Sequence, residues 1–126
     1  MDLLLDTHVF IWWDSSDTQL GIAAAAAIGD SDNRIFVSAA SAWEIAIKRQ
    51  AGRFDFTGSP SQAIAKNGFH PLPILGEHGE AAAVLPSIHK DPFDRILIAQ
   101  SIARNLVLVT ADDLIKQYST PLLWAR

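Results

Sequence analysis

Three short apolar runs, spaced along the chain with helical segments between them, constrain the fold most. They are residues 2–6, 34–37 and 106–110. Apolar runs of this length, without alternation of polar residues, are typical of strands buried on both faces of a parallel sheet. Two weaker extended segments, 69–74 and 121–124, contain prolines and fit the edges of a sheet. The sequence therefore predicts a three-layer α/β/α sandwich around a mostly parallel sheet of four to five short strands.

The composition is that of a globular protein. The 126 residues fit one domain, 1–126, and 49% of them are hydrophobic while 19% are charged. No apolar run reaches the roughly 18 residues that a membrane-spanning helix needs, and the first residues lack the basic segment of a signal peptide. There is no cysteine, which excludes disulfides and thiolate metal sites. We expect a cytoplasmic protein without membrane association.

The net charge limits how the chain binds nucleic acid. Its formal value is −4. A protein that holds nucleic acid by charge alone is normally basic, so the acidic balance argues against a simple DNA-coating module. A nuclease whose acids are neutralised by metal ions stays possible, since those ions become the largest local charges in the site.

The segment 89–100 has the signals of a helix start with an acid in its first turn. Proline disfavours the α region for the residue before it, so Asp91 is predicted to be the N-cap and Pro92 the first helical residue. Asp94 then falls in the first turn. A cap and a favourable helix-dipole charge explain both acids without any further function. The other acids of the chain bear on whether Asp94 does more.

Four acids are expected at one edge of the sheet. Asp6 ends the first strand and Asp112 follows the strand 106–110. Glu44 lies near the start of the helix after the second strand, and the helix of Asp94 is expected to begin on the same side. In parallel α/β sheets, sites form beyond the carboxyl ends of the strands. Structural alternatives exist, because Asp112 is also a possible N-cap and Glu44 also completes the capping-box pattern of residues 41–44, with Ser38 as a competing cap.

Converging carboxylates repel one another unless cations neutralise them. Oxygen ligands without cysteine or paired histidines favour hard ions such as Mg²⁺ or Mn²⁺. Such ions suit phosphodiester hydrolysis, because they help to generate hydroxide from water and stabilise the leaving oxygen. The four histidines, His8, His70, His78 and His89, show no ligand spacing and are expected to be structural or exposed.

The chain resembles the PIN-domain ribonucleases and, within them, the VapC-like toxins of bacterial toxin–antitoxin pairs. The resemblance covers nearly the whole length. Each motif alone is weak, but their order and separation are specific. The motifs are Leu3-Leu4-Leu5-Asp6-Thr7-His8, Ser38-Ala39-Ala40-Ser41-Ala42-Trp43-Glu44-Ile45, Asp91-Pro92-Phe93-Asp94-Arg95-Ile96-Leu97-Ile98-Ala99-Gln100 and Leu108-Val109-Thr110-Ala111-Asp112.

The resemblance implies a metal-dependent endoribonuclease that hydrolyses RNA phosphodiesters by metal-activated water. It implies a catalytic and metal-binding site of four acids, all of which are present: Asp6, Glu44, Asp94 and Asp112. It also implies inhibition by a cognate antitoxin and a homodimer. Asp113 competes with Asp112 for the last position, and Asp112 matches the family.

Several residues around this site have open roles. Arg95 and Lys48 are candidates for contacts with substrate phosphate, and the alternative for both is a solvated surface. Thr7 and Thr110 are candidates for hydrogen bonds to the metal ligands, or for local turn bonds. The apolar cluster 10–13 is predicted to contribute to the core, the dimer or the antitoxin groove.

Two other classes of function stay open on the sequence. A phosphatase or phosphotransferase of the haloacid dehalogenase type also begins with an acid after an apolar strand. Its chemistry usually needs a second Asp two residues later, where this chain has His8. A non-catalytic protein-binding module is the other alternative, and it leaves the four acids unexplained.

Overall fold

A five-stranded sheet with all strands parallel is the centre of the computed structural model, which describes residues 1–126. The strand order is β3-β2-β1-β4-β5, and β1 pairs with both β2 and β4. The predicted apolar runs form the three central strands, and the two proline-containing segments form the edges. The strands are β1 Asp2–Leu5, β2 Arg34–Ser38, β3 His70–Leu72, β4 Val107–Thr110 and β5 Leu122–Trp124.

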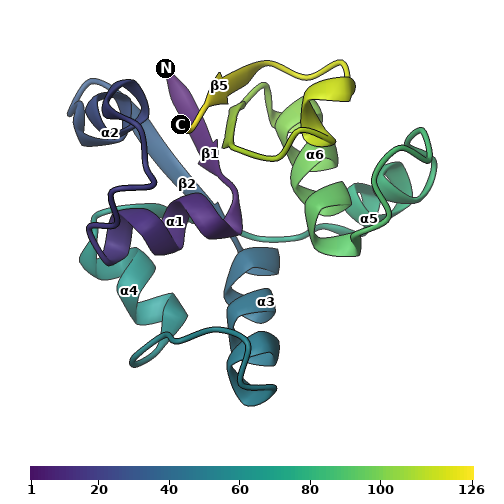
Figure 1. The fold of residues 1–126 in the computed structure, drawn as a ribbon. Helices are drawn as coiled ribbons and strands as arrows, with labels where there is room; N and C mark the ends of the chain where they lie inside the picture. Colours follow the sequence, from purple (N-terminus) through teal and green to yellow (C-terminus); the bar gives the residue numbers. More distant parts are fainter.

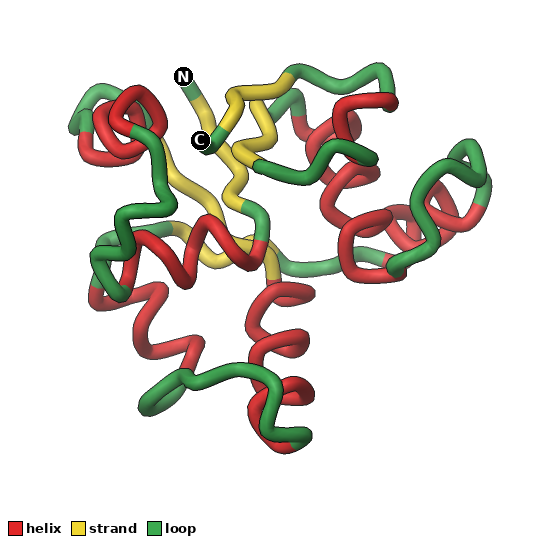
Figure 2. Tube along the Cα trace, viewed as in Figure 1, coloured by secondary structure: helices red, strands yellow, loops and turns green.

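Helices cover both faces of the sheet, which confirms the predicted three-layer sandwich (Figures 1 and 2). Helices α1, α2 and α4 lie on one side, and α5 and α6 on the other. Helix α3 leaves the carboxyl end of β2 and contacts α1, α4 and α6. No helix combines the length and apolar composition needed to cross a membrane. The helices are α1 Thr7–Asp14, α2 Ile22–Gly29, α3 Ala39–Gln50, α4 Pro60–Lys66, α5 Gly76–Ala83 and α6 Pro92–Arg104, followed by a 3₁₀ turn, Ile115–Gln117.

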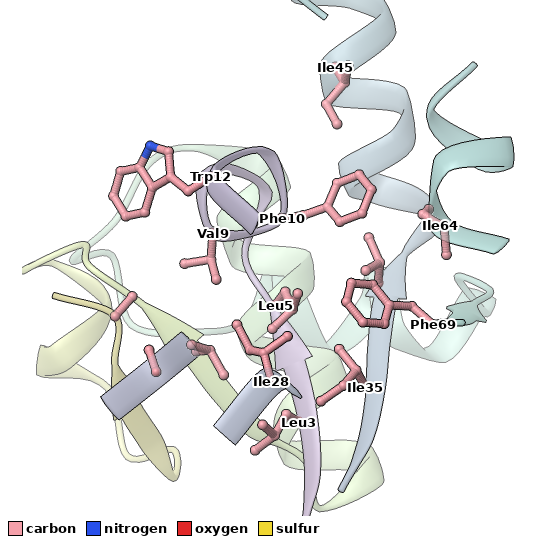
Figure 3. Packing of buried hydrophobic residues seen from close by; sticks show 14 of the residues in the cluster. Leu3, Leu5, Val9, Phe10, Trp12, Ile28, Ile35, Ile45, Ile64 and Phe69 are labelled. Carbon is pink, nitrogen blue, oxygen red and sulfur yellow. The ribbon is translucent and has the colours of Figure 1, made fainter. Parts of the chain in front are cut away.

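Each face of β1 packs into a separate hydrophobic cluster. Leu3 and Leu5 point to the side of α1, α2 and α4 and belong to the same hydrophobic cluster as Phe10 (Figure 3). Leu4 points to the opposite side and packs with Leu97 of α6 and other buried residues. All of these side chains are completely buried. Because both faces of the central strand are covered, its sequence has no polar alternation.

The apolar cluster 10–13 is mainly part of the core. Phe10 and Trp12 are buried, and Ile11 and Trp13 are half-buried against the same cluster. The large aromatic residue at the surface is instead Trp43 of α3, with 62% of its surface exposed. Its ring meets the edge of the Phe93 ring, with 5.3 Å between the ring centres.

Helix α6 begins where the sequence predicts. The Asp91 side chain accepts hydrogen bonds from the backbone N–H groups of Phe93 and Asp94 at 2.8 and 3.3 Å, and Pro92 is the first helical residue. At the other end, Asn105 adopts a left-handed conformation with φ of 54°. Asparagine tolerates this conformation better than residues whose side chains cannot bond locally.

The left-handed Asn105 makes a stability prediction. Asn105→Ala is expected to lower the free energy of unfolding by about 1 kcal/mol, because alanine has a steric penalty in this region. Asn105→Gly has no such penalty and is the matched control, expected to stay within about 0.5 kcal/mol of the wild type. Urea unfolding of the three proteins measures this. Equal stabilities of the alanine and wild-type proteins would contradict the capping role.

Candidate active site

A cavity of about 500 Å³ opens beyond the carboxyl ends of β1 and β4. From β1 the chain builds β2 and β3 on one side, and later β4 and β5 on the other, so this is the point where the strand order reverses. The lining is dominated by charged and polar side chains: Asp6, His8, Gln19, Glu44, Lys48, His89, Asp91, Asp94, Asp112 and Arg126. All four acids predicted from the sequence therefore line one cavity.

Asp6 is buried at the end of β1 and is held by two donors. One carboxyl oxygen accepts the backbone N–H of Val9 at 2.9 Å, which makes Asp6 the N-cap of α1. The other accepts the hydroxyl of Thr110 at 2.5 Å, so that threonine bonds to a predicted site acid. Burial raises the pKa of Asp6 above its ordinary value, while these two hydrogen bonds act in the opposite direction.

Glu44 does not take part in capping α3, so its side chain is available to line the cavity. The side chain of Ser38 is the N-cap, which places Ser41 inside the helix and excludes the capping-box alternative. The buried Glu44 carboxylate accepts the Thr7 hydroxyl at 2.6 Å. Its other oxygen accepts the Lys48 ammonium group at 2.5 Å. The Thr7 hydroxyl thus orients the Glu44 carboxylate, and the Lys48 ammonium group offsets its negative charge.

The pKa of Asp94 is strongly perturbed. It lies in the first turn of α6, and burial, as the largest cause, raises its pKa to about 8. The surrounding carboxylates add to this shift: Asp91, Asp6, Glu44 and Asp112. A carboxyl group with such neighbours is costly to ionise until a cation arrives.

Asp112, and not Asp113, faces the cavity. One oxygen of Asp112 accepts the backbone N–H of Leu114 at 2.8 Å in a local turn. The N-cap of the following 3₁₀ turn is Leu114, so the alternative of Asp112 as an N-cap is wrong. Its other oxygen lies 3.0 Å from Nε2 of His89. Asp113 is exposed and does not line the cavity. The Asp112 carboxylate therefore makes a local turn bond and also lines the cavity.

His89 is the site residue that the sequence reasoning missed. It is 8% exposed, and its Nε2 atom lies 2.9 Å from an oxygen of Asp94 and 3.0 Å from one of Asp112. The expectation that each histidine is structural or exposed gave His89 no place beside the acids, whereas its ring lies against two of them. Spacing along the chain could not reveal it, because Asp112 is 23 residues away. The nearest sequence signal was its position just before the N-cap of α6.

The two predicted phosphate-binding residues have different positions. Lys48 lines the cavity. Arg95 does not, because its guanidinium group donates to backbone carbonyls outside the cavity. These carbonyls belong to Ala82, Ala83, Leu85, Pro86 and His89, at 2.7 to 3.4 Å. An additional cation, Arg126, lines the cavity and lies 5.3 Å from the centre of the Trp12 ring.

The donor set fits a hard divalent cation. The carboxylates of Asp6, Glu44, Asp94 and Asp112 offer oxygen ligands only, and burial together with the neighbouring acids raises the pKa of Asp94, so this group is costly to ionise without a cation. Mg²⁺ and Mn²⁺ are the common ions for such ligands. The fold and the cavity together define a parallel α/β protein with a carboxylate site of the kind that holds these ions.

The chain belongs to the PIN domain family, whose model matches residues 3–120. It is 28% identical to Ribonuclease VapC22 from Mycobacterium tuberculosis over 130 aligned positions, which cover 94% of this chain and 93% of that protein. The fold is also similar to VapBC2 from Rickettsia felis bound to a DNA fragment from their promoter, with a TM-score of 0.70, 14% identity and full coverage of both chains. A toxin–antitoxin complex from Klebsiella pneumoniae has a TM-score of 0.65 at 17% identity, covering 96% of this chain and 95% of that one.

The raised pKa of Asp94 makes a prediction about stability and pH. Between the ordinary value of 3.8 and about 8, the folded protein keeps a proton that the unfolded chain releases. Each rise in pH within this window therefore favours the unfolded chain, by up to about 1.4 kcal/mol per pH unit. In the presence of a chelator, the free energy of unfolding is expected to fall as the pH rises through the window. Asp94→Asn is expected to reduce this dependence and to leave the part that the raised pKa of Asp6 contributes.

Urea unfolding at about pH 5 and about pH 7, both inside the window, measures the effect. Asp113→Asn is the matched control, since it removes an exposed neighbouring acid and should leave the slope unchanged. Saturating Mg²⁺ should reduce the slope of the wild type. Identical slopes for the wild type and Asp94→Asn would show that Asp94 is ionised in the folded state over this range.

Proposed function

We propose that this protein is a metal-dependent endoribonuclease, which hydrolyses RNA phosphodiesters with water as the nucleophile. The observation that carries the proposal is the convergence of four carboxylates from four separate segments on one cavity: Asp6, Glu44, Asp94 and Asp112. Membership of the PIN domain family and similarity to a named ribonuclease support the same conclusion. The position where a phosphatase of the alternative type needs a second acid is His8, so no observation favours that class.

The four acids would hold Mg²⁺ or Mn²⁺. Bound there, such an ion supplies charge neutralisation at the phosphate and an activated water. The chain itself orients the ligands. The Thr110 hydroxyl fixes one oxygen of Asp6, and the Thr7 hydroxyl fixes one oxygen of Glu44. These hydrogen bonds keep the carboxylates in place before substrate arrives, which reduces the reorganisation needed during the reaction.

Contacts with the RNA backbone are proposed for Lys48 and Arg126. Both line the cavity, and the acids beside them would otherwise repel a polyanionic substrate. Lys48 is held between the Glu44 carboxylate and the ring of Phe54, with 5.2 Å from Nζ to the ring centre. Arg95 is left out of this set, because its guanidinium group is occupied by backbone carbonyls.

We further propose that the protein is the toxin of a toxin–antitoxin pair, inhibited by a cognate antitoxin, and that it forms a homodimer. The toxin–antitoxin complex among its structural relatives supports the first part. An exposed apolar patch on α3 and α6 supports a protein interface. Trp43 and Ile47 lie one turn apart on α3 with exposed fractions of 62% and 43%, and Phe93 lies beside Trp43.

The site makes a direct prediction about activity. Asp6→Asn and Asp94→Asn are each expected to reduce RNA cleavage by about 100-fold or more, because each removes a charge that stabilises the transition state through the ion. Cleavage of total RNA with Mg²⁺, with Mn²⁺ and with a chelator measures this. Asp113→Asn should cleave like the wild type. Normal cleavage by both site variants would show that the active site lies elsewhere.

The exposed patch makes a prediction about assembly. If Trp43 contributes to a dimer interface, Trp43→Ser is expected to weaken self-association by about 10-fold or more, since central aromatic residues often dominate interface energies. Analytical ultracentrifugation over a concentration series measures the dissociation constant. Val84→Ser, which removes an exposed apolar side chain outside this patch, is the control. A wild-type protein that sediments as a monomer throughout would refute the dimer.

A further inference from the structure

We propose that His89 is a positioning residue that joins the carboxylates of Asp94 and Asp112 through its Nε2–H group, and that it is not itself a metal ligand. The inference rests on the proposed acidic site and assigns a residue to it that the family motifs did not supply. It depends on which nitrogen of the imidazole ring carries the proton, and the surroundings of His89 decide this.

Every polar group of His89 has a partner. Its backbone N–H donates to the hydroxyl oxygen of Tyr118 at 2.7 Å, and its carbonyl accepts from Arg95 at 3.0 Å. Its ring nitrogen Nδ1 accepts the backbone N–H of Asp91 at 3.1 Å. With both the backbone and Nδ1 fixed, the buried ring has one orientation, which points Nε2 into the cavity.

The contact with Asp91 determines the tautomer of the ring. A backbone N–H can only donate, so Nδ1 must present a lone pair to it. A neutral imidazole that has no proton on Nδ1 carries it on Nε2. The Nε2 atom therefore faces the oxygens of Asp94 and Asp112, at 2.9 and 3.0 Å, as a shared donor.

In His89 the accepting nitrogen, Nδ1, and the donating nitrogen, Nε2, are placed opposite to what binding of a metal by Nε2 needs. A ligating nitrogen requires its own lone pair, and the other nitrogen of such a ring usually donates its N–H to an acceptor. Here the other nitrogen meets a donor, the N–H of Asp91. The ligand atoms of His89, Asp94 and Asp112 lie within 4.8 Å of one another, close enough to surround an ion. The ring nevertheless cannot serve as a neutral ligand there without losing its contact with Asp91.

The Nε2–H group that Asp94 and Asp112 share would fix the distance between their carboxylates. Asp94 belongs to the first turn of α6, whereas Asp112 belongs to the segment after β4, so no backbone ladder sets the distance between their carboxylates. When both carboxylates are ionised, as they would be around a cation, they repel each other. His89 bonds to both and offsets that repulsion, so the two acids are held near the geometry in which they would receive a cation.

Histidine nitrogen NMR on the full chain tests the tautomer. Isotope-labelled protein is measured at about pH 8, above the ordinary histidine pKa of about 6.5, and the His89 signal is identified by its loss in His89→Gln. We expect the tautomer with the proton on Nε2, both without and with Mg²⁺. A proton on Nδ1, or loss of the Nε2 proton on addition of Mg²⁺, would overturn the proposal. This readout is independent of RNA cleavage, so an inactive protein can still pass it.

Calorimetric titration with Mg²⁺ tests the positioning role. His89→Leu removes the donor and is expected to weaken Mg²⁺ binding by about 10- to 100-fold. His89→Gln places an amide N–H donor at a similar reach and is expected to restore most of the affinity. His70→Gln, which changes an exposed histidine outside the cavity, is the control. Wild-type affinity of His89→Leu, or an equal loss in the glutamine and leucine variants, would overturn the proposal.

The proposed ribonuclease function and the proposed role of His89 can be refuted independently of each other. If Asp6→Asn and Asp94→Asn leave RNA cleavage intact while the tautomer is as expected, the proposed function is wrong and the contact of His89 stands. If those variants are inactive but His89 shows the opposite tautomer, the active site stands and the positioning role is wrong.

Discussion

Mutual repulsion between crowded carboxylates is the constraint around which the rest of this structure is arranged. Five acids line a single cavity, and burial prevents water from screening them fully. Nearby donors offset part of the cost: two threonine hydroxyls, the ammonium group of Lys48 and the imidazole of His89. The offset is incomplete, since the pKa of Asp94 still reaches about 8. An assembly of this kind is poised for a cation and is not optimised for stability on its own.

Helix starts supply the acids with fixed positions. Asp6 caps α1, Asp91 caps α6, and Asp112 binds the backbone N–H of Leu114. A carboxylate in such a position is favoured by the helix dipole and by the free N–H groups. The same contacts aim it at the end of the sheet. Structural and chemical interpretations of these acids are therefore two descriptions of one arrangement.

Features that depend on neighbouring residues can be predicted from the sequence, whereas contacts between distant segments cannot. The central strands and the start of α6 depend on local signals, such as an unbroken apolar run or the pair Asp91-Pro92, and were predicted. The approach of the acids follows from strand order and the usual geometry of parallel sheets. The bond between His89 and Asp112 has no local signal, because it joins segments that meet only in the folded chain. The choice of Ser38 over Ser41 as a cap likewise needed the actual end of β2.

The hydrogen bonds of the Arg95 guanidinium group limit insertions and deletions around the start of α6. Arg95 binds carbonyls at the end of α5 and in the connection to α6, while the preceding residue, Asp94, faces the cavity. Successive helical residues are rotated by about 100°. The buried Leu97 fixes the rotation of α6 in the core, so a residue inserted or deleted between Arg95 and Leu97 would turn both side chains away from their partners at once. Surface connections usually accept changes in length. The connection between α5 and α6 is bound by Arg95 through the carbonyls of Leu85, Pro86 and His89, so a change in its length would disturb these hydrogen bonds.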